Sequence, residues 1–130
     1  MESIEIRTKS RVELVDITKD VKKIVNKSGV KNGLAVVYTK HTTTAIIVNE
    51  NEGGLKRDII STLEKIVPSN GSYAHNAIDN NADAHIRAVL LGNSAVIPVF
   101  NSKLCLGTWQ SVFLVELDGP RKRTVYVTVI

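Results

Sequence analysis

The alternation of apolar and polar residues along the chain predicts a protein rich in β-strands. The opening stretch, residues 3–17, alternates with period two on both sides of Lys9-Ser10, which indicates two strands or one long bent strand. Apolar runs predict further strands at 34–40, 44–48, 94–100, 104–107, 108–117 and 124–130. We expect the opening stretch to form a hairpin with residues 34–40. Pro98 lacks a backbone N–H, so its strand should lie at an edge or carry a bulge.

Apolar positions spaced three and four apart predict three helices, at 18–28, 55–67 and 82–91. Residues that cap or stop helices bound them: Thr18, Gly29, Pro68 and Gly92. The polar stretch 69–81 lacks periodicity and indicates a surface loop. Strands outnumber helices, and the helices interrupt the strands without regular alternation. The pattern therefore predicts an α+β fold, one domain over 1–130, with a large, mostly antiparallel sheet or sandwich and helices packed on one side.

Composition narrows the class of protein. The 130 residues suit one core, with 43% apolar and 23% charged residues as in ordinary globular domains. No apolar run approaches the roughly 20 residues of a membrane span, and the amino terminus lacks an apolar signal segment. The single cysteine, Cys105, is expected to be a buried apolar filler and favours a reducing, cytoplasmic location. The net charge of +4 favours anionic ligands but is too small to indicate a nucleic-acid partner.

The three histidines lie at polar junctions rather than on apolar faces. His41 ends a strand, His75 lies in the polar loop, and His85 lies on the third helix. Asp79 and Asp83 are among the residues between the last two histidines. Two imidazoles with carboxylates between them predict a site for zinc or another divalent ion. The spacing matches no compact metal motif, so a loop held by its own Asp and Asn side chains stays an alternative.

Polar residues occupy both ends of the apolar strand 44–48. His41, Thr42 and Thr43 precede it, and the residues after it include Asn49, Glu50, Asn51, Arg57 and Asp58. The strand spans roughly 20 Å at ~3.3 Å per residue, so it cannot bring both ends to one small ligand. Either the ends serve different sites, or a neighbouring subunit brings a second copy close.

The strand 108–117 opens with the only tryptophan, Trp109, beside Gln110. With period two, Trp109 continues an apolar row that includes Phe113 and Val115, so core packing is one interpretation. The other is that Trp109 stacks on a planar ligand while Gln110 reads its edge.

Charged residues follow the same strand at Glu116, Asp118 and Arg121. They form a surface ion network in one interpretation. In the other they gather at the sheet end, where the Arg121 guanidinium would bind a phosphate with bidentate geometry.

Three stretches together carry a family resemblance: HTTTAIIVNEN at 41–51, YAHNAIDNNADAHIRAVLLGNSAVIPV at 73–99, and LGTWQSVFLVELDGPR at 106–121. They resemble the YjbQ-type family of small proteins, some of which carry the label secondary thiamine-phosphate synthase. The resemblance implies a mixed α+β fold, a homotrimer, and a pocket near the subunit boundaries lined by the histidines.

The resemblance also implies site residues. The candidate catalytic residues are His41, Glu50, Asp58, Asp79, Asn81 and Gln110. Asn49 and Trp109 join Arg121 as candidate substrate-binding residues. His41, from the same or an adjacent subunit, becomes the candidate third metal ligand beside His75 and His85.

The family label implies a transferase that joins a pyrimidine diphosphate to a thiazole phosphate and releases pyrophosphate. Such chemistry needs a divalent cation such as magnesium or zinc, cationic donors such as Arg121 or Lys40, and an aromatic surface such as Trp109. Two alternatives stay open. One is a metal-dependent hydrolase with Glu50 or Asp79 as general base, and the other is a non-catalytic binding protein for an anionic metabolite.

Overall fold

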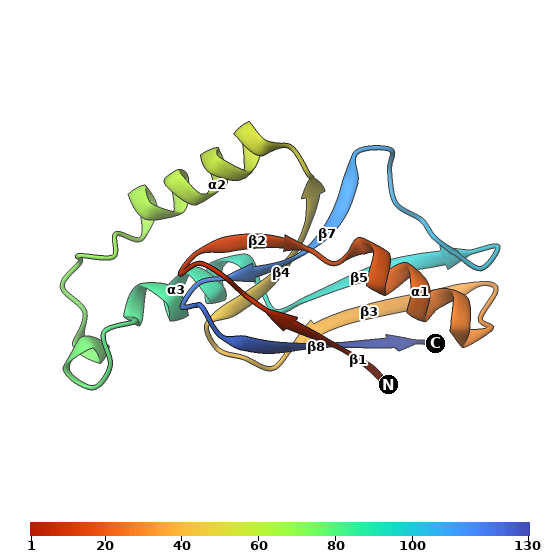
Figure 1. Ribbon diagram of the computed structural model, residues 1–130, viewed down its shortest axis with the longest axis horizontal. Coiled ribbons are helices and arrows are strands. Elements are labelled where there is room, and N and C mark those ends of the chain that lie inside the picture. The colour runs from red at the N-terminus through yellow and green to blue at the C-terminus, as the bar shows by residue number, and fades with distance from the viewer.

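The computed structural model describes residues 1–130 and confirms the α+β fold (Figure 1). In chain order the elements are β1 (Glu2–Arg7), β2 (Glu13–Asp16), α1 (Thr18–Ser28), β3 (Gly33–Thr39), β4 (Thr44–Glu50), α2 (Gly53–Ile66), the 3-10 helix η1 (Ala74–Ala77), α3 (Ala82–Leu91), β5 (Ser94–Phe100), β6 (Lys103–Leu104), β7 (Gln110–Glu116) and β8 (Lys122–Val129). The polar stretch that the sequence marks as a loop therefore contains the short helix η1. No helix is both long enough and apolar enough to span a bilayer.

The ends of α1 show how local chemistry sets an element. Gly29 ends the helix with φ 73°, a left-handed conformation that glycine adopts without steric cost. At the other end the prediction of Thr18 as the capping residue is wrong, because Ile17 occupies that position. The Asp16 carboxylate accepts from the amide and the hydroxyl of Thr18 instead.

The strands form two antiparallel sheets rather than one. The larger has the order β1-β8-β3-β5-β6 and the smaller has the order β2-β7-β4. The predicted hairpin between the opening stretch and β3 is wrong: β1 pairs with β8, and β2 pairs with β7. Strand β8 lies between β1 and β3 and takes the pairing edge that the hairpin would have used. The last strand of the chain therefore lies inside the larger sheet, between β1 and β3.

Two further predictions concern β5 and β6. The Pro98 carbonyl accepts from the Cys105 amide (2.9 Å), so the imide nitrogen of Pro98 faces the same outer side, where β6 has only two residues. The expected edge position of the Pro98 strand is wrong, because β6 pairs with β5 and forms that edge of the larger sheet. The expected burial of Cys105 is wrong, since the residue is exposed. Leu104 faces the core, and strand alternation turns its neighbour outward.

The main core lies between the inner face of the larger sheet, helix α1 and the smaller sheet. Val37, Val125 and Val21 of α1 are fully buried there. Strand β7 lies between β2 and β4 and buries both of its faces, with Leu114 in the main core and Val115 in a second core beside α3. A strand buried on both faces loses the one-sided pattern that period-two reasoning assumes.

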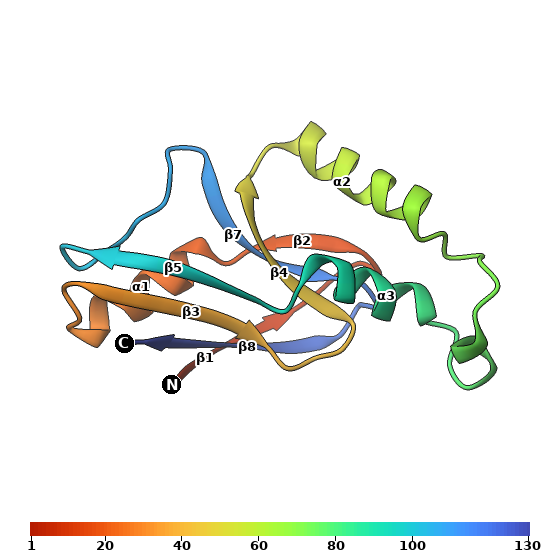
Figure 2. The ribbon, with the colours of Figure 1, turned by 180° about the vertical axis from the view of Figure 1, so that it is seen from behind.

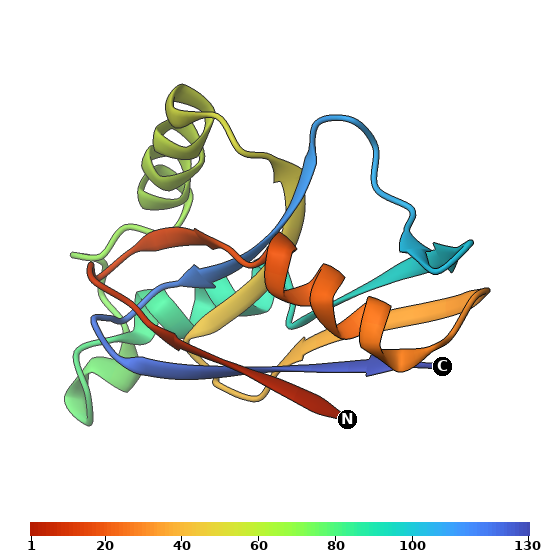
Figure 3. The ribbon, with the colours of Figure 1, turned by 45° about the vertical axis from the view of Figure 1, so that its right-hand side comes forward.

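The outer face of the larger sheet is apolar and uncovered. Leu34, Val96 and Phe100 lie on this face and are 40%, 59% and 62% exposed. In the view from behind, no helix crosses in front of β3, β5 and β8 (Figure 2). Helix α2 also stands away from both sheets (Figure 3), and only Leu63 of its apolar stripe is buried.

Candidate functional site

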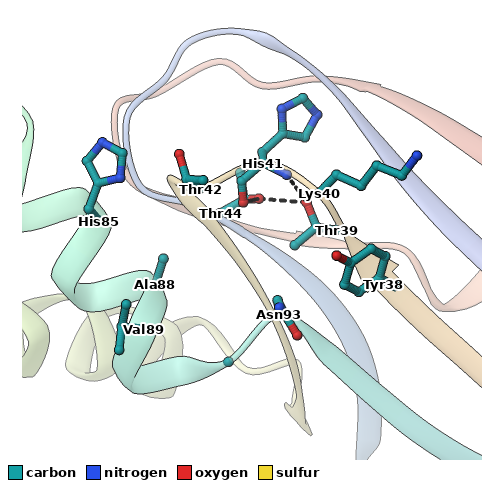
Figure 4. Close-up of a pocket in the computed structure, with 11 residues that line it drawn as sticks. Tyr38, Thr39, Lys40, His41, Thr42, Thr44, His85, Ala88, Val89 and Asn93 are labelled. Carbon is teal, nitrogen blue, oxygen red and sulfur yellow. Dashed lines mark hydrogen bonds between the residues drawn. The ribbon is translucent and has the colours of Figure 1, made fainter.

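A cavity of about 540 Å³ opens between helix α3 and the turn 40–43 that joins β3 to β4 (Figure 4). Side chains with hydrogen-bond donors border it: Lys40, His41, Thr42, His85 and Asn93. The volume falls within the range of about 300–1,000 Å³ that small-molecule pockets occupy. A hollow of this size bordered by cationic and neutral donors favours a small anionic ligand.

Buried threonines hold the turn in place. The hydroxyls of Thr39 and Thr44 lie 2.8 Å apart and form a hydrogen bond across the turn. The Thr43 hydroxyl accepts from Arg123 (2.8 Å). Of the three threonines that follow His41, only Thr42 is exposed, so the hydroxyl-rich sequence serves mainly to shape the turn.

His41 is half-buried, and a backbone contact fixes its proton. The Thr124 amide donates to Nε2 of His41 (3.1 Å), so the remaining proton of the neutral ring lies on Nδ1. Burial lowers the pKa of His41, and the positive charge of Arg123 lowers it further. His41 is therefore neutral near pH 7 and has a hydrogen-bond donor at Nδ1.

A buried ion pair lies behind this turn. Arg123 donates to both carboxylate oxygens of Glu116, at 2.9 Å from Nε and 2.6 Å from Nη2. Burial alone raises the pKa of Glu116, but the hydrogen bonds from Arg123 and Thr8 outweigh it and hold the pKa below its usual value. The proposed surface network is therefore wrong for Glu116, which is fully buried. Asp118 and Arg121 do form an ion pair (3.2 Å).

Arg123 supports the turn although it is not among the residues expected at the site. It precedes the strand expected at 124–130, yet it lies in β8 and is 4% exposed. Counting back by two from the core residues Val127 and Val125 reaches position 123, so strand alternation carried the signal.

The other two histidines, His75 and His85 of α3, contact each other through their rings. The rings of His75 and His85 are edge to face with centroids 4.8 Å apart. Both border a second hollow of about 510 Å³, so His85 lies between the two cavities. Nε2 of His75 lies 3.0 Å from Oδ1 of Asn81, and the Asn81 amide nitrogen donates to Asp118 (2.9 Å). Asn81 is 6% exposed, so its side chain contacts these neighbouring residues rather than solvent.

The far end of β4 carries a separate group. Glu50 and Asn49 pair across the sheet with Gln110 and Ser111 of β7. Trp109 precedes Gln110 and is 72% exposed, so the core interpretation of Trp109 is wrong: the side chain lies outside the strand, in the loop before β7. The turn with His41 and the group with Glu50 therefore lie at opposite ends of β4.

Three other candidate residues lie outside both cavities. Asp58 is exposed on α2, and Asp79 is exposed between η1 and α3. Arg121 is exposed and donates to the backbone carbonyl of Asp118 as well as to its carboxylate. Their predicted roles in catalysis and phosphate binding stay predictions.

The histidines do not form a complete metal site within one chain. No three His, Cys, Asp or Glu side chains gather as a group that could hold an ion. The lone pair of His41 at Nε2 is occupied by the Thr124 amide, and a metal ligand needs a free lone pair. A divalent ion bound by His75 and His85 therefore needs a further ligand from elsewhere, and the predicted ion stays a prediction.

Comparison with known proteins places the chain among a set of close relatives. The family described as "UPF0047 protein YjbQ-like" matches residues 2–130. A UPF0047 protein of Methanothermobacter thermautotrophicus is 54% identical over 128 residues, covering 98% of this chain and 90% of the relative.

Two crystal structures have the same fold. A YbjQ-like protein of unknown function from Sulfolobus solfataricus P2 superimposes with a TM-score of 0.97 at 46% identity, over 98% of this chain and 94% of that one. A YjbQ/UPF0047-family protein from Clostridium acetobutylicum gives 0.96 at 44% identity, over 100% of both chains.

Proposed function

The chain belongs to the YjbQ-like UPF0047 family, and we propose that it is a small-molecule enzyme that binds a phosphorylated substrate in the cavity between turn 40–43 and α3. The observation that carries the proposal is the Thr124 hydrogen bond to His41. It leaves a neutral imidazole N–H at Nδ1 of His41. Lys40, the preceding residue in the chain, borders the same cavity. Donors held in place before the ligand arrives stabilise developing negative charge without reorganisation.

The reaction that we propose is the transferase reaction implied by the family resemblance. A new carbon–nitrogen bond joins the pyrimidine methylene to the thiazole nitrogen, and the carbon–oxygen bond to the diphosphate breaks, so pyrophosphate leaves with the electron pair. Lys40 and the Nδ1–H of His41 would stabilise the charge on that leaving group. A divalent ion, when bound, would neutralise part of the same charge.

The second part of the proposal is a homotrimer. It is supported by the uncovered apolar residues on the larger sheet and by those on α3, where Val89 and Leu90 are 82% and 61% exposed. Exposed apolar residues that gather on one face mark interaction sites. In the proposed trimer a neighbouring subunit supplies a second copy of the Glu50 and Gln110 group to the histidines, which would explain why one strand has polar residues at both ends.

The reaction is tested by incubating the protein with the pyrimidine diphosphate and the thiazole phosphate and measuring thiamine phosphate by chromatography, with magnesium, zinc or manganese added in turn. We expect product with wild type, and a loss of roughly 100-fold or more in kcat/KM for Lys40→Gln, as for removal of one charge-stabilising donor. Lys23→Gln, an exposed lysine on α1, is the matched control and should match wild type.

Two outcomes would redirect the assignment. Saturable binding of the phosphorylated substrates without turnover would support the binding-protein alternative. Release of inorganic phosphate from simple phosphate esters, without formation of thiamine phosphate, would support the hydrolase. For the assembly, static light scattering should give three times the chain mass, and a monomer at micromolar concentration contradicts the trimer.

A further inference from the structure

Asn81 uses its side chain in an unusual way for its position. It is the residue that precedes helix α3, a place where asparagine normally accepts a hydrogen bond from the first helical amides. Its side chain makes no such bond. The Asn76 side chain accepts from the Ala82 amide instead (3.1 Å). The Asn81 amide is thereby free to bridge two other groups.

The bridge has a defined direction. Oδ2 of Asp118 accepts from the Asn81 amide nitrogen (2.9 Å) and from Arg121 (3.2 Å). An ionised carboxylate has no proton to donate, so the nitrogen of the Asn81 amide must face Asp118. The oxygen Oδ1 then faces His75, 3.0 Å from Nε2. Because Oδ1 only accepts, Nε2 of His75 must carry the proton.

We propose that Asn81 and Asp118 are positioning residues that hold neutral His75 in a single tautomer, with the proton on Nε2 and the free lone pair on Nδ1. The edge-to-face contact with His85 helps to fix the ring plane. His41 has the opposite tautomer because the Thr124 amide occupies its Nε2. The first cavity is therefore bordered by an imidazole that donates through Nδ1, His41, and the second by an imidazole that accepts through Nδ1, His75.

This inference rests on the proposed function only in the role that it gives to Nδ1 of His75. In the proposed enzyme, Nδ1 of His75 is the atom that can accept a proton or bind a cation, while Nε2 is not available. The tautomer itself follows from hydrogen bonds within the chain, so it can be tested without any activity.

The test is long-range proton–nitrogen NMR on protein labelled with nitrogen-15 at histidine, recorded well above the ordinary imidazole pKa of about 6.5. The His75 signals are assigned by their absence in His75→Gln. We expect wild-type His75 to show a fully protonated-type Nε2 and a fully unprotonated-type Nδ1, with His41 showing the reverse. Free histidine exchanges between both forms, which gives averaged nitrogen shifts.

Two variants separate positioning from simple packing. Asp118→Asn lets the Asn81 amide turn over, so the His75 nitrogen shifts should move towards averaged values while the backbone spectrum keeps its dispersion. Asn81→Ala should have the same effect. Asn80→Ala, at an exposed neighbour, is the control and should leave the His75 shifts unchanged.

The proposal is overturned if wild-type His75 shows averaged shifts or carries its proton on Nδ1, whatever the variants do. It is also overturned if Asp118→Asn and Asn81→Ala fold and leave the His75 shifts unchanged. Failure of the transferase assay leaves this result standing, and failure here leaves the transferase assay standing, so the two proposals are tested separately.

Discussion

Glu116→Gln should destabilise the protein more than any conservative exchange on its surface. The Glu116 carboxylate is fully buried and accepts from Arg123, from the Thr8 hydroxyl (2.7 Å) and from the amides of Leu117 (3.0 Å) and Asp118 (3.1 Å). Glutamine keeps the shape but removes the charge. Its amide NH₂ is a donor, and it would face the N–H and O–H donors that now bind the carboxylate. Arg123 is left buried without a counter-charge.

The expected loss is about 3–5 kcal/mol, the cost of breaking a buried ion pair by removing one partner. A domain of this size has only about 5–15 kcal/mol of stability, so the variant should fold but melt on the order of 10–20 °C lower. The free energy of unfolding is measured by urea denaturation followed by circular dichroism. Glu5→Gln is the matched control, since Glu5 pairs with Lys122 at the surface (3.4 Å) and such pairs contribute about 0–1 kcal/mol.

A double variant completes the experiment. Glu116→Leu with Arg123→Met replaces both charges with apolar groups and should recover the part of the loss that comes from the unpaired charge, while the Thr8 hydroxyl and the Leu117 and Asp118 amides still lack their acceptor. A Glu116→Gln variant within about 1 kcal/mol of wild type, or a Glu5→Gln variant that loses as much stability as Glu116→Gln, would contradict the role of the buried pair.

Other predictions follow from burial and charge. Trp109→Ala should change the free energy of unfolding by less than about 0.5 kcal/mol, as for most surface exchanges, whereas Phe113→Ala should cost about 3–5 kcal/mol; a large loss for Trp109 in urea denaturation contradicts its exposed position. Because the pKa of Glu116 lies below its ordinary value of 4.5, the stabilisation it provides is complete above that pH and is lost as pH falls through the lowered pKa. Wild type should therefore lose more stability than Glu116→Gln between neutral and acidic pH, and equal slopes of unfolding free energy against pH contradict the pairing.

Much of the fold could be predicted from periodicity, because most elements expose one face. The helices at α1, α2 and α3 and most strands appear within a few residues of their expected positions. Pairing could not be predicted in the same way. Which strand lies beside β3 depends on where the chain end returns, and alternation within a strand contains no information about its partner.

The residue types of the candidate site could likewise be predicted from the sequence, but their contacts could not. Histidine, asparagine and lysine at strand and helix ends are visible in the sequence, and His41 and His85 do border one cavity. The proton position on His41 depends on the Thr124 amide, and the one that we propose for His75 depends on the Asp118 carboxylate acting through Asn81. Thr124 and Asp118 lie far from these histidines in the sequence. Trp109 misleads period-two reasoning because the strand begins one residue after it.

The most direct test of the proposed function is a titration of nitrogen-15-labelled protein with inorganic pyrophosphate, followed by amide and imidazole chemical shifts. We expect saturable changes at Lys40, His41 and Thr42 in the turn and at His85 on α3, with weaker binding in Lys40→Gln than in Lys23→Gln. Changes confined to the Glu50 and Gln110 end of β4, or no saturable change at millimolar pyrophosphate, would contradict the placement of a phosphorylated ligand beside His41.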